Sequence, residues 1–341
     1  MRINFIIPHK RLSGGNRVIY IYANYLTSMG HDVCCYLPAI SYPAIGVNLF
    51  LRTKASIGNL INTEHWFDCN FPVKVVPKIN DCFVRDADVV IATAVQTAFD
   101  VDRLSSKKGK KNYFVQDYEV FSEDENMVIE SYKLGMPIIT ITKELGSIID
   151  KYNTNVKVVH NGLFPEEFIK EGKQKNDILH VMTMYHSSPR KRTKDALEVF
   201  SNAASSGLEI VPVIFGRKID RVFPHYYIVR ENPKREELIE MYQKSDAYLF
   251  TSEIDAWGLP IVEAMANKCA VIGRNIGALK ELHTKNNSVI INSSTDYLKV
   301  LKLLNNNRNM LYSIQNKGYE TVQDLRWEKS ASLFEKLLLR E

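Results

Sequence analysis

The sequence predicts an α/β protein made of two similar halves, each with a parallel sheet covered by helices. Short apolar strands alternate with amphipathic helices along the whole chain, a pattern typical of βαβ units. A length of 341 residues fits two domains of normal size better than a single core. With 45% hydrophobic and 24% charged residues, the composition is that of a folded globular protein.

Charge and cysteine content narrow the class of protein. The net charge of +5 permits anionic partners such as nucleotides without requiring them. The basic cluster at residues 107–111 is interpreted as a solvated loop, with contact to anionic headgroups or an anionic acceptor as the alternative. The five cysteines are odd in number and lack zinc-site spacing, so no disulfide framework is expected. No stretch reaches transmembrane length and residues 3–8 are too short for a signal peptide, which predicts a cytoplasmic protein.

The first half reads as a series of strands and helices in strict alternation. The first strand is followed by a loop with Gly14-Gly15 and by a helix that places Val18, Tyr22 and Leu26 on one face. Further helices are expected around residues 127–133 and 144–151. The expected strands cover residues 3–7, 33–37, 89–92, 113–116, 138–141 and 156–159.

A polar segment with Pro165 and Gly172 separates the two halves and predicts a linker over residues 166–177. The first domain is therefore expected at 1–165 and the second at 178–320, followed by a closing helix over 321–341. Helices of the second half are expected near 193–204, 236–244, 260–267 and 296–304. Its strands are expected at 178–182, 210–215, 226–229, 247–251, 270–272 and 288–291. Since ligands bind beyond the carboxyl ends of such strands, we expect a cleft between the halves.

Residues 252–273 form a loop, a helix and a strand that together predict an anion site. Pro260 fits the first turn of a helix, where its missing N–H costs nothing. Gly258 has no side chain, so a ligand can approach the backbone closely. The N-terminus of the helix presents free N–H groups and the positive end of the helix dipole.

Two acids accompany this helix, and two interpretations of them remain open. Glu263 lies one turn inside the helix, and its two acceptor oxygens match a vicinal diol such as ribose. Asp255 lies in the preceding loop and would face another part of the same ligand, which together describes a sugar nucleotide. Alternatively, Glu263 is a salt-bridge or helix-dipole acid and Asp255 is a solvated loop residue. Spacing alone does not decide between them.

Residues 255–266, DAWGLPIVEAMA, resemble the signature of glycosyltransferase family 4, the retaining enzymes of GT-B fold. The family pattern is an acid, seven residues and Glu within a Gly-Leu-Pro…Glu-Ala-Met phrase. The family usually has Glu where this chain has Asp255, so the reach to the transferred sugar is one methylene shorter. Segments at 159–162, 236–247 and 327–330 are similar to family segments in the same order, and Gly14-Gly15 stands at the family's N-terminal glycine loop.

The resemblance implies two Rossmann-like domains facing each other across a cleft, an α/β architecture named GT-B. It implies an acceptor domain at 1–165, a sugar-nucleotide domain at 178–320 and a helix at 321–341 that crosses back to the first domain. The amides of Gly258 and Leu259 would hold the diphosphate, Glu263 the ribose and Asp255 the transferred sugar, while Gly14-Gly15 would close over the phosphates. Residues 113–119, YFVQDYE, resemble the branch that includes rhamnosyltransferases using dTDP-rhamnose.

The loop at residues 185–194 supplies the expected cations. Lys191 matches the family lysine that stabilises the charge of the leaving diphosphate, and Arg190 is the candidate for the family arginine. Arg192 stands where the family usually has glycine. The alternative is a solvated basic loop.

Other polar residues carry weaker hypotheses. Gln116 and Asp117 lie at the end of the strand expected at 113–116. Gln116 can hydrogen-bond a sugar, and Asp117 either orients the acceptor hydroxyl or caps a loop. His9 either approaches the acceptor or is a surface histidine. Asp86 and Asp88 resemble the Asp-x-Asp of metal-dependent enzymes, but they lead directly into the strand at 89–92 and are interpreted as its polar start.

These observations predict a retaining glycosyltransferase of hexosyl type. It would transfer a sugar, with rhamnose as one candidate, from a nucleoside-diphosphate sugar to a glycan or lipid-linked acceptor in surface polysaccharide biosynthesis. No cofactor or metal is expected, since family 4 enzymes generally need no metal and the dinucleotide and P-loop motifs are missing. Peripheral contact with the inner face of the membrane is compatible with this, and nucleic acid is not expected. The alternatives are a non-catalytic GT-B partner subunit that binds sugar nucleotide and a GT-B sugar-nucleotide epimerase.

Overall fold

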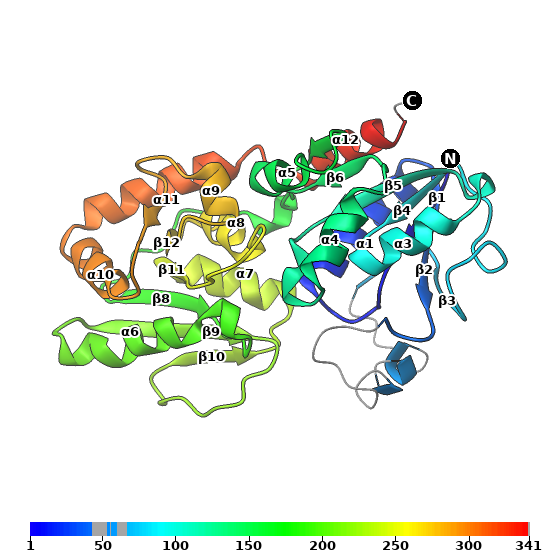
Figure 1. Ribbon diagram of the computed structural model, residues 1–341. Coiled ribbons are helices and arrows are strands. Elements are labelled where there is room, and N and C mark those ends of the chain that lie inside the picture. The colour runs from blue at the N-terminus through cyan, green and yellow to red at the C-terminus, as the bar shows by residue number, and fades with distance from the viewer. Residues whose placement is uncertain (43–52, 55, 60–66, 340–341) are drawn as a thin grey trace. The chain divides into compact units, whose positions relative to one another are not determined.

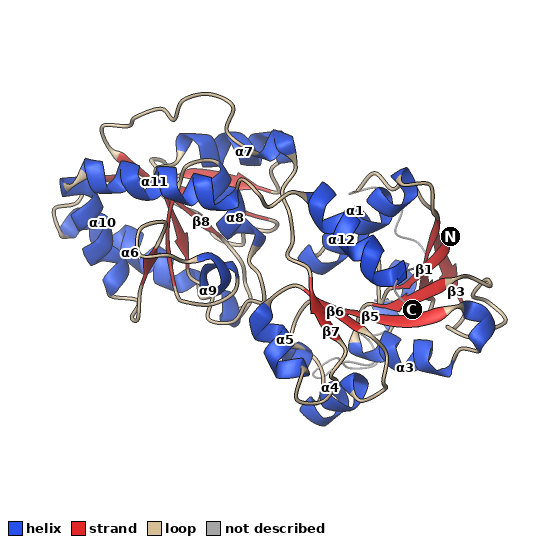
Figure 2. Cartoon of the chain, turned by 90° about the horizontal axis from the view of Figure 1, so that it is seen from above, coloured by secondary structure: helices blue, strands red, loops and turns tan. Residues whose placement is uncertain are grey.

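The computed structural model describes residues 1–42, 53–54, 56–59 and 67–339 (Figure 1). The chain divides into two compact units. The first unit comprises Met1–Gly162 together with Trp327–Glu341, and the second unit comprises Leu163–Arg326. Each unit is built on a parallel sheet, and in Figure 2 the strands of each sheet are flanked by helices.

The sheet of the first unit has the strand order β3-β2-β1-β4-β5-β6-β7. All of its pairings are parallel, and the register sets Ile3 of β1 beside Val33 of β2 and Val89 of β4. Its strands are β1 Arg2–Ile6, β2 Asp32–Pro38, β3 Val73–Val76, β4 Val89–Ala92, β5 Lys110–Val115, β6 Ile138–Thr140 and β7 Val156–Val158. Its helices are α1 Gly14–Ser28, α3 Val95–Arg103, α4 Glu125–Tyr132, α5 Lys143–Ile149 and α12 Trp327–Leu339.

The sheet of the second unit has the order β10-β9-β8-β11-β12-β13 and is also parallel throughout. Its strands are β8 Leu179–Met184, β9 Ile210–Gly216, β10 Ile228–Glu231, β11 Ala247–Phe250, β12 Ala270–Gly273 and β13 Val289–Ile290. Its helices are α6 Thr193–Ser205, α7 Arg235–Lys244, α8 Leu259–Ala266, α9 Ala278–Leu282, α10 Asp296–Asn306 and α11 Arg308–Val322.

The pleat of β11 explains how helices cover both faces of the second sheet. Leu249 belongs to the same buried cluster as Phe200 of α6 and Leu301 of α10. The next residue back, Tyr248, points to the opposite face and has its ring 5.9 Å from that of Tyr242 in α7. The helix α7 therefore lies on the face opposite to α6.

The end of the chain differs from the single closing helix expected over residues 321–341. The helix α11 ends at Val322 and α12 begins at Trp327, with a turn between them. The helix α12 belongs to the first unit, where the rings of Phe334 and Tyr22 stack with centroids 4.4 Å apart. Oε1 of Glu335 in α12 also lies 2.7 Å from Nε2 of His31.

The segment expected as a linker, residues 166–177, is part of the second unit. The backbone N–H of Ile169 donates to Ala266 O at 3.0 Å, at the end of α8. The ammonium of Lys173 donates to Tyr242 O at 3.0 Å and Asn267 O at 2.9 Å, and also to Ser245 O. These carbonyls lie at the carboxyl ends of α7 and α8, where the last carbonyls of a helix need donors from outside it. Tyr242 O accepts in addition from Ser245 N at 3.1 Å. The polar composition of the segment therefore reflects capping of helix ends and not a free tether.

The first unit contains two elements that the sequence did not predict, the edge strand β3 and the helix α3. The strand β5 begins at Lys110, earlier than expected, so part of the basic cluster at 107–111 is strand and not loop. Lys108 is buried and pairs with Asp86 at 2.8 Å, while Asp88 accepts from Arg2 N at 2.7 Å. The two aspartates are thus a polar start to β4. Across the described residues, no helix combines the length and the hydropathy needed to cross a membrane.

We expect Lys173→Met to lower the free energy of unfolding by about 1–3 kcal/mol, because carbonyls at two helix ends lose a charged donor. Methionine keeps much of the aliphatic stem. The measurement is urea unfolding, with the exposed Lys170→Met as the control. Equal stability of the two variants would mean that residues 163–177 do not hold α7 and α8.

Candidate functional site

Three loops meet at the carboxyl edge of the second sheet, after β8, β11 and β12. Hydrogen bonds tie the first two together: Thr251 Oγ1 donates to Lys191 O at 2.8 Å, and Glu253 N donates to Arg190 O at 2.8 Å. Arg274, which follows β12, donates to Thr251 O at 2.7 Å. The backbones of the three loops are therefore fixed relative to one another, because each of these bonds ends on a backbone carbonyl.

Lys191 and Asp255, predicted from separate motifs, form an ion pair. Lys191 Nζ lies 2.5 Å from Asp255 Oδ2, and the side chains are 14% and 16% exposed. Breaking a pair so enclosed leaves a charge with little water to solvate it. Burial and then the charges of Lys191 and Arg190 lower the pKa of the neighbouring His186, against the raising effect of Asp255. An anion would be attracted to this loop.

Gly258 is the N-cap of α8 and has a φ of +75°, in the left-handed region. A Cβ atom at this position would lie 2.9 Å from Ile261 Cδ1 and 3.1 Å from the ring of Phe250. The backbone conformation and this packing both require glycine, in addition to any close approach of a ligand. The helix begins at Leu259, one residue earlier than expected, so its first N–H groups follow directly on the loop of Asp255.

Glu263 is 3% exposed and does not stand alone inside α8. Its Oε1 lies 2.9 Å from Arg235 Nη2, and its Oε2 accepts from the hydroxyl of Tyr242 at 3.2 Å. Arg235 also pairs with Glu167. This is the salt bridge that one of the two interpretations predicted. Sequence reasoning missed Arg235 and Glu167, because nothing near either residue marks it as a partner of α8.

Arg192, at the position where the resemblance to family 4 predicts glycine, has a φ of 46° in the left-handed region. Asp195 accepts from its Nε at 3.0 Å and from its Nη2 at 3.1 Å. Asp195 also accepts from Arg274 Nη2 at 3.0 Å. The left-handed backbone explains why glycine is favoured here, and the ion pairs offset a conformational cost of about 1–2 kcal/mol.

In the first unit, Gly15 and Gln116 lie together. Gln116 Nε2 donates to Gly15 O at 3.2 Å, and a Cβ atom on Gly15 would lie 3.6 Å from the same nitrogen. Ser13 caps α1 by accepting from Asn16 N at 3.1 Å, and a Cβ on Gly14 would meet nothing within 4 Å. The predicted glycine loop and the predicted sugar-binding amide therefore share one edge of the first sheet.

Asp117 caps a local turn by accepting from Tyr118 N at 2.9 Å, as one of its interpretations predicted. Its neighbour Glu119 accepts from Val95 N at 3.3 Å. Burial raises the pKa of Glu119 to about 8, against the lowering effect of that hydrogen bond and with a further rise from the Asp117 charge. Burial and then the charge of Arg11 lower the pKa of His9 to about 4, and Asn16 Nδ2 lies 3.0 Å from its ring nitrogen. His9 is therefore a neutral, anchored loop residue.

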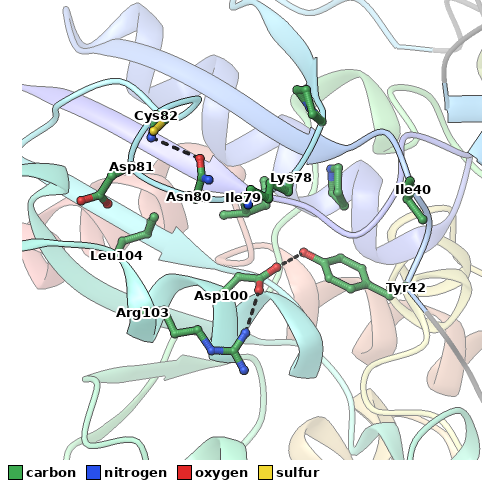
Figure 3. Close-up of a pocket in the computed structure, with 12 residues that line it drawn as sticks. Ile40, Tyr42, Lys78, Ile79, Asn80, Asp81, Cys82, Asp100, Arg103 and Leu104 are labelled. Atoms are coloured by element: carbon green, nitrogen blue, oxygen red, sulfur yellow. Dashed lines mark hydrogen bonds and ion pairs between the residues drawn. The ribbon is translucent and has the colours of Figure 1, made fainter.

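A groove of about 640 Å³ also lies in the first unit, after β2 and β3 and beside α3 (Figure 3). Figure 3 shows Tyr42 and Arg103 converging on Asp100, at 2.5 Å and 3.3 Å from its two oxygens. None of the site residues predicted from the sequence lines this groove.

Comparisons with known proteins place the chain in context. Residues 164–321 match the family described as glycosyl transferases group 1. No curated protein matches the chain. Sucrose-phosphate synthase from Thermosynechococcus elongatus is similar in structure with a TM-score of 0.72, 11% identity and 98% of each chain covered. Anabaena Alr3699/HepE in complex with UDP and glucose is similar with a TM-score of 0.71, 12% identity and 98% of each chain. WaaG, a glycosyltransferase involved in lipopolysaccharide biosynthesis, has a TM-score of 0.63, 15% identity and coverage of 97% of this chain and 99% of its own.

We expect Lys191→Met and Asp255→Asn each to lower the free energy of unfolding by about 1–3 kcal/mol, and the double variant to lose less than the sum. Each single change leaves the other group enclosed without its partner. Urea unfolding of the four proteins measures the coupling, with the exposed Lys194→Met as control. Additive losses would show that the two groups do not interact in solution.

Proposed function

We propose that this chain, whose residues 164–321 match the family of glycosyl transferases group 1 and whose fold is GT-B, transfers a sugar from a nucleoside-diphosphate sugar with retention of anomeric configuration. The observation that carries the proposal is the Lys191–Asp255 pair in the loops that precede α6 and α8. It joins a cation suited to a diphosphate with an acid suited to a sugar hydroxyl. Both residues come from motifs that resemble family 4.

The donor would bind along the carboxyl edge of the second sheet. The N–H groups of Gly258 and Leu259, at the N-terminus of α8, together with Lys191 would hold the diphosphate. Glu263 would accept from the ribose hydroxyls and Asp255 from the transferred sugar. The structural similarity to HepE, which has been solved with UDP and with UDP-glucose, supports a nucleoside diphosphate as the shared ligand.

The proposed reaction breaks the bond between the anomeric carbon and the phosphate oxygen. The acceptor oxygen forms its bond to the same carbon from the same face, and its proton passes to the leaving phosphate oxygen. Lys191, Arg190 and the α8 N-terminus would stabilise the negative charge that develops on the diphosphate. This reaction, as written, requires no protein nucleophile and no metal ion.

The first unit would bind the acceptor, which we propose is a glycan or a lipid-linked glycan of a surface polysaccharide. Gly14 and Gly15 would approach the donor phosphates, Gln116 the transferred sugar and Asp117 the acceptor hydroxyl. The resemblance of residues 113–119 to rhamnosyltransferases favours dTDP-rhamnose among the donors. The similarity to WaaG, a glycosyltransferase involved in lipopolysaccharide biosynthesis, supports a role in building a surface glycan.

We expect one of UDP, dTDP, GDP and ADP to raise the melting temperature without added metal and in the presence of EDTA. At a concentration 100-fold above its Kd, the shift should be about 5 °C, since the ligand stabilises only the folded state. Differential scanning fluorimetry measures it. A response that requires Mg²⁺ would contradict the metal-free site, and no response from any nucleotide would contradict the donor site.

We expect Asp255→Asn and Lys191→Met to lower kcat roughly 10²–10³-fold while the nucleoside diphosphate still binds, because each group acts mainly on the charge or sugar of the transition state. The measurement combines a transfer assay with calorimetry, with Lys194→Met as control. Binding without transfer or donor hydrolysis by the wild-type protein would favour the non-catalytic partner subunit. An epimerised sugar nucleotide as the product would favour the epimerase.

A further inference from the structure

Arg235, the first residue of α7, lies between two buried carboxylates. Its Nη2 is 2.9 Å from Glu263 Oε1 and also contacts Glu167 Oε1. Glu263 and Glu167 are 3% and 2% exposed. One guanidinium nitrogen thus joins the acid of α8 to an acid at the start of the second unit.

The carboxylate of Glu263 is held from both sides. Its other oxygen accepts from the hydroxyl of Tyr242, on α7, at 3.2 Å. Asn267 then bonds the backbone carbonyls of both acids, at 2.9 Å to Glu167 O and 2.8 Å to Glu263 O. A side chain fixed at both oxygens cannot turn freely.

The arrangement also keeps Arg235 charged. Burial lowers the pKa of Arg235, and the charges of Glu263 and Glu167 raise it by more, so the guanidinium stays protonated. A charged donor therefore faces the carboxyl group of Glu263.

We propose that Arg235 is a positioning residue of the donor site. It holds the side chain of Glu263 oriented for the hydroxyls of the nucleotide ribose, and it thereby makes the site selective for a nucleotide that carries them. The inference rests on the proposed function, and it adds a residue that touches the acid instead of the ligand. Lysine would keep the positive charge, but its ammonium lies on a flexible stem and is less fixed in position.

The test compares a nucleoside diphosphate with its 3′-deoxy form: UDP with 3′-deoxy-UDP, or the matching pair for whichever of the four nucleotides responds in the thermal shift. Calorimetry gives both Kd values for the wild type, Arg235→Met and Glu263→Gln. The control is Arg230→Met, which removes an exposed arginine paired with Glu237 at 2.8 Å. Thermal unfolding of each variant establishes that it is folded.

We expect the wild type and Arg230→Met to prefer the 3′-hydroxyl form by roughly 10-fold to 100-fold, the scale of a charged hydrogen bond. In Arg235→Met and Glu263→Gln the ratio should approach one, and the double variant should be no worse than either. Arg235→Lys should recover only part of the ratio, and it replaces Arg235→Met in the comparison if the latter does not fold.

A loss of affinity for both forms in Arg235→Met, with the ratio unchanged, would overturn the positioning role and leave Arg235 a structural ion-pair residue. A preserved ratio in Glu263→Gln would overturn the ribose assignment itself. Absence of nucleotide binding in the wild type would instead contradict the proposed function, before any variant is compared.

Discussion

A parallel sheet brings the carboxyl ends of all its strands to one edge, and the candidate site depends on this constraint. In the second unit, the loops that follow β8, β11 and β12 leave the same edge and bond to one another through Thr251 O, Lys191 O and Arg190 O. Lys191 and Asp255 lie 64 residues apart in the chain and 2.5 Å apart in space for that reason. The order of the strands in the sheet therefore brings Lys191 and Asp255 together, and their ion pair is a consequence of that order.

Burying charge is the second feature that shapes this unit. Glu167 and Glu263 are buried against the partly exposed Arg235, and Lys173 caps the ends of α7 and α8 with a single ammonium. Charges buried alone would cost several kcal/mol each, so these positions are tolerable only as sets. The sets also connect α8 to the segment at which the chain enters the second unit. The helix α8 and the first residues of the second unit thereby belong to one network of polar contacts.

The sequence predicted the elements that have strong local signals and missed those that depend on distant partners. The apolar runs at 247–251 and 270–272 correspond to β11 and β12, because central parallel strands are buried on both faces. The edge strand β3 carries Lys74 and is only partly buried, so it lacks such a run. The segment at 166–177 read as a linker because Lys173 looks solvated until its carbonyl partners are known. Arg235 likewise reads as an ordinary helix-start residue, since Glu167 lies 68 residues away.

The two departures from the family pattern, Arg192 and Asp255, have physical explanations in the structure. Arg192 keeps the left-handed backbone that glycine would adopt, and Asp195 and Glu253 lie near its guanidinium, at 3.0 Å and 3.7 Å. Asp255 has a shorter side chain than glutamate, yet it contacts Lys191 and so stays in the loop between β11 and α8. Both departures are thus accommodated by local contacts: the left-handed backbone is kept at residue 192, and residue 255 keeps an ion pair with Lys191.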